Sequence, residues 1–234
     1  MAANQKGVTL VEIAIMLAIV GLLLGGMVKG NQLIANARVH SLISQQEGFK
    51  IAYLGFRDRF NALPGDYPRA SVHIGGVVAA ANGNGNGQIT PLGVAGATID
   101  EHIAVWDHLS KAGFIGGSYT YAASPETPAS APTNAFGRFL RIAFDNAYGN
   151  GLAPASHNLK TGNYIPSDIL AEVDRKIDDG IAIGGKFRFS PYAGGGVPSA
   201  APAGAGGCYA FTPSGIAYWV AAAPDANCGG ASLL

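Results

Sequence analysis

The chain has 234 residues, of which 48% are hydrophobic and only 13% are charged, with 15 basic and 15 acidic side chains. Soluble domains carry roughly 25% charged residues, so part of this chain is expected to lie in an apolar environment. The balanced charge includes no basic field and no acidic tail, which argues against nucleic-acid binding. The length suits one domain with an accessory element.

The first predicted element is an apolar helix over residues 8–28, in which Glu12 is the only charged side chain. A helix of that length spans roughly 30 Å, the thickness of the hydrocarbon core of a bilayer. The run is too long for a cleaved secretory signal, whose apolar region covers roughly 7–15 residues. A plain membrane anchor is the other alternative, but a carboxylate costs about 2.5–3.5 kcal/mol at the centre of such a helix. Glu12 therefore needs a partner or a role.

The helical pattern continues past residue 28 and is predicted to end at Pro64-Gly65. Positions separated by alternate steps of four and three form one stripe, and eight of the nine are apolar or aromatic: Ala35, Val39, Leu42, Gln46, Phe49, Tyr53, Phe56, Phe60 and Leu63. A continuous helix over residues 8–63 would be about 80 Å long. Its first part would lie in lipid or in a filament core, and its second part would pack on a head.

Beyond residue 64 the pattern predicts an α+β head, with short helices followed by strands. A capping box at Thr98–Glu101 is expected to open a helix that closes near Gly113. A second short helix is predicted over residues 167–179. Strands are predicted over residues 138–144, 181–189, 208–211 and 216–220, with an exposed loop over 190–207.

Residues 82–87, Asn-Gly-Asn-Gly-Asn-Gly, resemble half of a calcium loop, with side-chain oxygens at alternate positions. The asparagines are neutral and no glutamate follows at the spacing of an EF-hand, so a glycine-rich turn is the favoured interpretation. No catalytic motif occurs, and no cofactor or metal site is predicted. His102 and His108 are six residues apart and do not share a helix face, which favours surface or core positions over metal ligation.

The chain has two cysteines, Cys208 and Cys228, and both lie near the C-terminus. An N-terminal anchor would leave the head outside the cytoplasm, where cysteine pairs oxidise. No further ligands cluster there, as a metal site would require. We therefore expect one disulfide between Cys208 and Cys228.

The stretch Lys6-Gly7-Val8-Thr9-Leu10-Val11-Glu12, with the apolar helix after it, resembles the class III signal of type IV pilins and type II secretion pseudopilins. In that family a prepilin peptidase cuts after the glycine and methylates the new amine. The resemblance implies cleavage between Gly7 and Val8, N-methylation of Val8, and an assembly role for Glu12. Val8 stands where the family most often has phenylalanine, which makes the methylated residue unusual.

The rest of the chain extends the resemblance less specifically. The segments 62–66, 106–114 and 176–180 are similar to segments of large bacterial pilin-like proteins, and the cysteine pair is similar to the disulfide-bounded C-terminal region of type IV pilins. The implied organisation is a leader over residues 1–7, a long helix over 8–63 whose residues 8–28 form the transmembrane or filament-core part, and a globular head over 64–234.

The resemblance implies a structural subunit of a type IV pilus or related pseudopilus, not an enzyme. Its partners would be identical or related pilin subunits, the prepilin peptidase, and the inner membrane with its pilus or secretion machinery. It would be stored in the bacterial inner membrane with its head in the periplasm, and then enter a filament at the cell surface. A minor pilin or a secretion pseudopilin is the alternative within this class, and an envelope-anchored enzyme is the alternative from another class.

Overall fold

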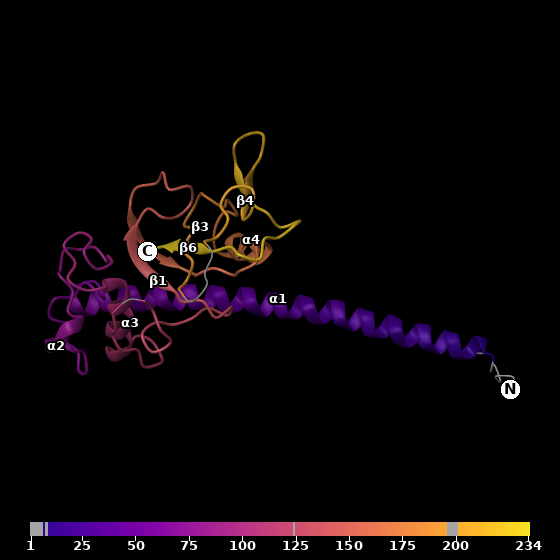
Figure 1. Ribbon diagram of the computed structural model, residues 1–234, viewed down its shortest axis with the longest axis horizontal. Helices are drawn as coiled ribbons and strands as arrows, with labels where there is room; N and C mark the ends of the chain where they lie inside the picture. Colours follow the sequence, from indigo (N-terminus) through magenta and orange to yellow (C-terminus); the bar gives the residue numbers. More distant parts are fainter. Residues whose placement is uncertain (1–6, 8, 124, 196–200) are drawn as a thin grey trace, which may run out of the picture. The chain divides into compact units, whose positions relative to one another are not determined.

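The structure is a computed structural model that describes residues 7, 9–123, 125–195 and 201–234. The chain divides into two compact units, Met1–Arg38 and Val39–Leu234. Helix α1, Leu10–Phe60, contributes residues to both units (Figure 1). The division therefore falls within the long helix. Fold class α+β is confirmed, with a long N-terminal apolar helix and antiparallel sheets.

Helix α1 ends at Phe60, before the predicted end at Leu63. Asn61 adopts a φ of 48°, in the left-handed region. A residue in that region commonly ends a helix, and asparagine is one of the few residues that adopts it readily. The expectation that Pro64-Gly65 stops the helix is therefore wrong, because the backbone has already left the helical conformation at Asn61.

The part of α1 in the second unit buries the predicted stripe. Its buried residues include Val39, Leu42, Gln46, Tyr53 and Phe56, and Phe49 and Phe60 pack against the same core while partly exposed. Most exposed residues on the other faces of this part of the helix are polar or charged, with Ile51 as an exception at 70% exposure. The period of the pattern therefore predicts the buried face of α1 correctly.

The second unit contains a four-stranded antiparallel sheet in the order β1-β2-β6-β3. The last strand in the sequence, β6, lies between β2 and β3, so residues at the C-terminus complete the middle of the sheet. The bounds are β1 Arg141–Asp145, β2 Ser156–Lys160, β3 Phe187–Phe189 and β6 Gly230–Leu233.

A separate two-stranded sheet joins β4, Tyr209–Phe211, to β5, Ala217–Trp219. Helix α3, Glu101–Lys111, packs against β1, while α4, Ser167–Ile177, packs against β3 and β5. The short helix α2, Ala70–His73, lies against the 3₁₀ turn η1, Ala79–Ala81. Both predicted helices and the strands 208–211 and 216–220 are confirmed with small changes of boundary.

Two other strand predictions are only partly correct. The predicted strand 138–144 begins at Arg141, and of the predicted strand 181–189 only Phe187–Phe189 joins the sheet. Ile181 forms an isolated bridge to Tyr218 instead. Strands β2 and β6 were not predicted. Part of the predicted loop 190–207, residues 196–200, lies outside the described residues.

The Asn-Gly loop is organised around a buried carboxylate. The backbone N–H groups of Gly85 and Asn86 donate to one oxygen of Asp66, at 2.6 and 3.1 Å, and that of Gly87 donates to the other at 2.8 Å. Burial raises the pKa of Asp66, although these bonds oppose the shift. The loop therefore presents N–H donors to an internal anion, which supports the turn interpretation over the calcium-loop interpretation.

The Pro64-Gly65 segment is joined to α3 by a buried histidine. The Gly65 N–H donates to Nδ1 of His108 at 2.8 Å, and the His108 Nε2 bonds the carbonyl oxygen of Ala81 at 2.9 Å. Gly65 has a φ of 86°, and a Cβ there would lie 2.3 Å from the carbonyl oxygen of Glu101. Glycine is therefore required at this position both for its conformation and for the close approach. Burial lowers the pKa of His108 to about 4.

Candidate functional site

The segment that carries the predicted function lies at the start of α1. Gly7 is described and exposed, while Val8 lies outside the described residues. The predicted cleavage between Gly7 and Val8, and the predicted methylation of Val8, therefore stay predictions.

Thr9 starts the helix. Its carbonyl oxygen accepts the backbone N–H groups of Glu12 and Ile13, at 3.1 and 3.2 Å, and its hydroxyl also accepts the N–H of Glu12 at 3.3 Å. A threonine in this position caps a helix because its side chain satisfies a free N–H of the first turn. Glu12 thus lies in the first turn of α1, where a carboxylate interacts favourably with the helix dipole.

The Glu12 side chain is exposed. Among the described residues, none forms an ion pair with its carboxylate. The geometry therefore leaves an anionic group available at the beginning of an apolar helix. This is the arrangement that the assembly role of Glu12 requires, and that role stays a prediction.

The apolar side chains that follow are also exposed. Leu10 is 87% exposed and Leu22 is 79% exposed, and every other large apolar side chain between Leu10 and Val28 is also exposed. In the part of the chain that the structure describes, α1 is the one helix long and apolar enough to cross a membrane. Monomeric soluble proteins rarely expose so large an apolar surface, which indicates a membrane or protein partner.

Four glycines in this region, Gly21, Gly25, Gly26 and Gly30, are helical within α1. A Cβ added at any of them would meet nothing within 4 Å. Gly21 and Gly25 are one helical turn apart, and so are Gly26 and Gly30. Glycines with this spacing allow two helix backbones to approach closely. Helix α1 is continuous through these four positions, so the glycines leave open surface on α1 without interrupting the helix.

The expected disulfide is present. Cys208 and Cys228 are bonded to each other and are fully buried. Cys208 immediately precedes β4, and Cys228 lies two residues before β6. The bond therefore links the two-stranded sheet to the four-stranded sheet.

Loss of this bond should destabilise the second unit. A crosslink between residues separated by 20 positions contributes about 3 kcal/mol, chiefly by restricting the unfolded chain. We expect the double variant Cys208→Ala/Cys228→Ala to lower the free energy of unfolding by about that amount in denaturant titrations. Reduction of the unaltered chain should produce a similar loss, and equal stability with and without the bond would contradict the prediction.

Three aspartates in the second unit, Asp174, Asp178 and Asp179, have carboxylate oxygens within 4.8 Å of one another. Asp174 is fully buried and accepts the indole N–H of Trp219 at 2.7 Å, and burial raises its pKa to about 6. Asp178 accepts two backbone N–H groups at the start of β3. These bonds give the two aspartates a structural role in the turn from α4 to β3.

Both histidines of α3 are core residues. His102 is 3% exposed and His108 is fully buried, and burial lowers the pKa of each to about 4. His108 uses both ring nitrogens in the bonds described above, which identifies its role as structural. Both histidines therefore occupy core positions, one of the two kinds of position that the sequence favoured.

The polar residue of the predicted apolar stripe, Gln46, is buried. Gln46 is only 2% exposed, and its Oε1 accepts the Ser232 hydroxyl of β6 at 2.8 Å. The sequence marked Gln46 as the exception to the stripe, but nothing in the sequence indicated the residues from β3 and β6 that gather around it.

Comparison of the chain with protein-family models, with curated proteins and with solved structures found no match.

Proposed function

We propose that this chain is the structural subunit of a type IV pilus or a related pseudopilus. The observation that carries the proposal is the exposed apolar surface of α1, with the single carboxylate of Glu12 in its first turn. The prepilin-like residues before this helix, Lys6-Gly7, add support from the sequence. The second unit, which includes the later part of the helix, contains a disulfide bond, as is common in exported domains.

The mechanism that we propose is assembly. A peptidase removes residues 1–7, the apolar helix holds the chain in the inner membrane, and the subunit then moves from the membrane into a helical filament. Lipid is as apolar as the helix surface, so the transfer gains little hydrophobic free energy, and helix packing must supply the attraction. The open glycine positions between Gly21 and Gly30 provide surface for such packing.

Glu12 supplies register in this mechanism. Cleavage would place a new cationic amine on Val8, less than two helical turns from Glu12. Within a stack of subunits, the amine of one copy would pair with the carboxylate of the next. A buried pair of this kind contributes specificity more than stability, because desolvation offsets much of the attraction. Subunits out of register would leave both charges unpaired in an apolar core.

Processing provides the direct test. We expect the intact mass of the chain from the cell envelope to show loss of Met1–Gly7 and the addition of one methyl group, located on the Val8 amine by fragmentation. Gly7→Ala should be cut less efficiently, and Gly7→Phe should keep the leader, because a small residue is expected at the cut. Gly75→Ala is a matched control, since a Cβ at that exposed turn position would meet nothing within 4 Å.

Filaments that contain chains with an intact Met1 would contradict the proposal. A cut elsewhere in the segment, or an unmethylated Val8 amine, would contradict the assigned cleavage and methylation. The mass spectrum of purified filaments also separates the two alternatives within the class. A major pilin would dominate the spectrum, whereas a minor pilin or pseudopilin would be a trace component beside another subunit.

A further inference from the structure

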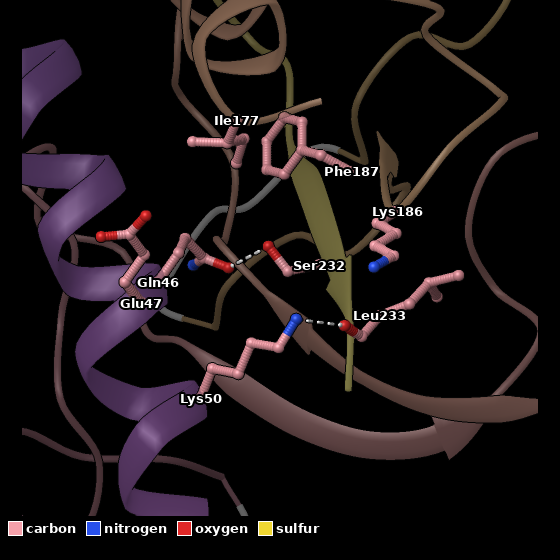
Figure 2. A pocket seen from close by; sticks show the side chains of 8 residues that line it. All are labelled: Gln46, Glu47, Lys50, Ile177, Lys186, Phe187, Ser232 and Leu233. Carbon is pink, nitrogen blue, oxygen red and sulfur yellow. Dashed lines mark hydrogen bonds between the residues drawn. The ribbon is translucent and has the colours of Figure 1, made fainter. Parts of the chain in front are cut away.

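A small pocket lies in the second unit, between the last part of α1 and the β3–β6 edge of the sheet. Its volume is about 120 Å³. Figure 2 shows the side chains that line it, which come from α1, from the end of α4, from the segment before β3, from β3 itself and from β6: Gln46, Glu47, Lys50, Ile177, Lys186, Phe187, Ser232 and Leu233. Pairing of β3 with β6 fixes one side, because Phe187 is the register partner of Ser232.

Two ammonium groups reach this pocket from opposite sides. Lys50 extends from α1 and its Nζ lies 3.5 Å from the carbonyl oxygen of Leu233, while Lys186 extends from the segment before β3 (Figure 2). The backbone holds Lys186 in place, since its carbonyl oxygen accepts the Leu233 N–H at 2.8 Å. Within the described ranges, neither lysine forms an ion pair.

Gln46 adds a third donor. Its Oε1 accepts a hydrogen bond from the Ser232 hydroxyl. Gln46 is only 2% exposed, yet its Nε2 has no hydrogen-bond partner among the described residues. An unpaired buried donor costs about 1–3 kcal/mol, so a fold that retains one has a donor available for a ligand.

The acidic groups nearby do not fill the pocket. Figure 2 shows the Glu47 carboxylate directed away from Ser232 and Leu233. Asp178, in the turn before Lys186, is held by the backbone N–H groups of Lys186 and Phe187. The apolar side chains of Ile177 and Phe187 form the remaining wall (Figure 2). The pocket therefore combines two cations and an amide donor with an apolar wall.

We propose that this pocket binds a carboxylate carried on a short aliphatic stem. The carboxylate would accept hydrogen bonds from the Lys50 and Lys186 ammonium groups, with the Gln46 amide beside it, and the stem would contact Ile177 and Phe187. Charge-assisted bonds of this kind are stronger than neutral ones. The volume is well below the roughly 300–1,000 Å³ of sites for drug-sized molecules, so the occupant is a small acid or an acidic side chain.

Butyrate is a suitable probe, and the full chain in detergent micelles is the material. The readout is the rate at which an acetylating reagent modifies each lysine, measured by mass spectrometry. We expect butyrate to slow the modification of Lys50 and Lys186 with a dissociation constant of millimolar order. Lys176, which pairs with Glu172 on α4 outside the pocket, is the internal control. Butyramide and sodium chloride at equal ionic strength should protect neither pocket lysine.

Two substitutions test the donors. Lys50→Met should weaken the protection of Lys186 by butyrate about tenfold, as the loss of one charge-assisted bond implies. Gln46→Glu keeps the acceptor for Ser232 and places a carboxylate inside the pocket. It should therefore abolish protection by butyrate, and should itself slow acetylation of Lys50 and Lys186. Lys176→Met should leave protection unchanged, and thermal melts of all variants confirm that the unit is folded.

The carboxylate has two possible sources, a free acid or an acidic side chain of a neighbouring copy, and the second rests on the proposed function. In assembled filaments, a neighbour's side chain would slow acetylation of both lysines without butyrate, whereas a site for a free acid would respond to butyrate as in micelles. If processing were disproved, the micelle experiment would still stand. Three results would overturn the proposal. They are equal protection of the lysines by butyramide, protection by butyrate that survives Gln46→Glu, and no protection by butyrate at about 100 mM, which is far above a millimolar dissociation constant.

Discussion

Acidification from pH 6.5 to about 4 should remove stability on the order of 5 kcal/mol that two buried histidines contribute to the second unit. The cause is a pair of buried histidines in α3, because burial lowers the pKa of His102 and that of His108 to about 4. Between these pH values the unfolded chain binds protons at both imidazoles while the folded chain does not. The free energy of unfolding must then fall as the pH falls.

The geometry explains why the folded state resists protonation. Nδ1 of His108 accepts the Gly65 N–H at 2.8 Å, so a proton on that nitrogen would remove the acceptor and place two donors face to face. Nδ1 of His102 is buried and has no hydrogen-bond partner among the described residues, so its protonated form would lack an acceptor. His157 adds to the same trend, since burial lowers its pKa to about 4.

Asp174 acts in the opposite direction. Its pKa is raised by burial to about 6, so the folded chain binds a proton there more readily than the unfolded chain does. Its contribution to stability is complete below its unfolded pKa of about 4 and is lost as the pH rises through 6. One such carboxylate offsets about one histidine, and burial raises the pKa of Asp66 and that of Glu101 in the same direction.

His108→Gln provides the test. Glutamine is neutral, and its amide can accept from Gly65 and donate to Ala81, so the variant removes the titration while allowing both bonds. We expect the slope of unfolding free energy against pH between 4 and 6.5 to decrease by about one proton, measured by denaturant titrations across that range. Val72→Leu changes an exposed side chain that does not titrate and should leave the slope unchanged. Identical slopes for His108→Gln and the unaltered chain would contradict the assignment.

The sequence predicted helices α1, α3 and α4 and the disulfide because these features depend on local pattern. The stripe in α1 repeats with the helical period, and the two cysteines have only each other as partners. Strands β2 and β6 lack such a pattern. In β2 the polar residues Asn158 and Lys160 are buried, and Lys160 Nζ bonds Asp145 at 2.9 Å. That pairing depends on the neighbouring strand, which composition alone does not reveal.

The capping box illustrates how tertiary contacts replace a local one. Glu101 was expected to bond back to Thr98, but the residue before α3 is Asp100 and no side-chain cap forms there. The Glu101 carboxylate instead accepts the backbone N–H groups of Asn84 and Thr90, both at 3.1 Å. Glu101 is therefore used to hold two loops that lie earlier in the sequence.

The two candidate sites differ in how much of each could be predicted from the sequence. Glu12 and the apolar run stand out in the sequence, because a charge within an apolar helix is visible without a structure. The carboxylate pocket requires Gln46, Lys186 and Ser232 to come together from three distant segments. Of these, only Gln46 carried a detectable indication, as the polar member of an apolar stripe.

Glu12→Leu should separate assembly from membrane insertion. The substitution makes the helix more apolar, so insertion and removal of the leader should be retained or improved. Assembly should fall sharply, because the amine of the adjacent subunit would enter an apolar core without its partner. Removing one member of a buried ion pair costs about 3–5 kcal/mol.

The measurement is the fraction of chain in sheared filaments relative to the fraction in membranes, with the variant expressed alone and together with the unaltered chain. Ile13→Leu is the matched control, since it alters the neighbouring apolar position without changing charge. We expect that control to assemble normally, and we expect Glu12→Leu to be processed but largely absent from mixed filaments. A Glu12→Leu chain that enters filaments as well as the control would mean that Glu12 does not set register. The exposed apolar surface of α1 would then have to specify subunit packing through its side chains and glycines alone.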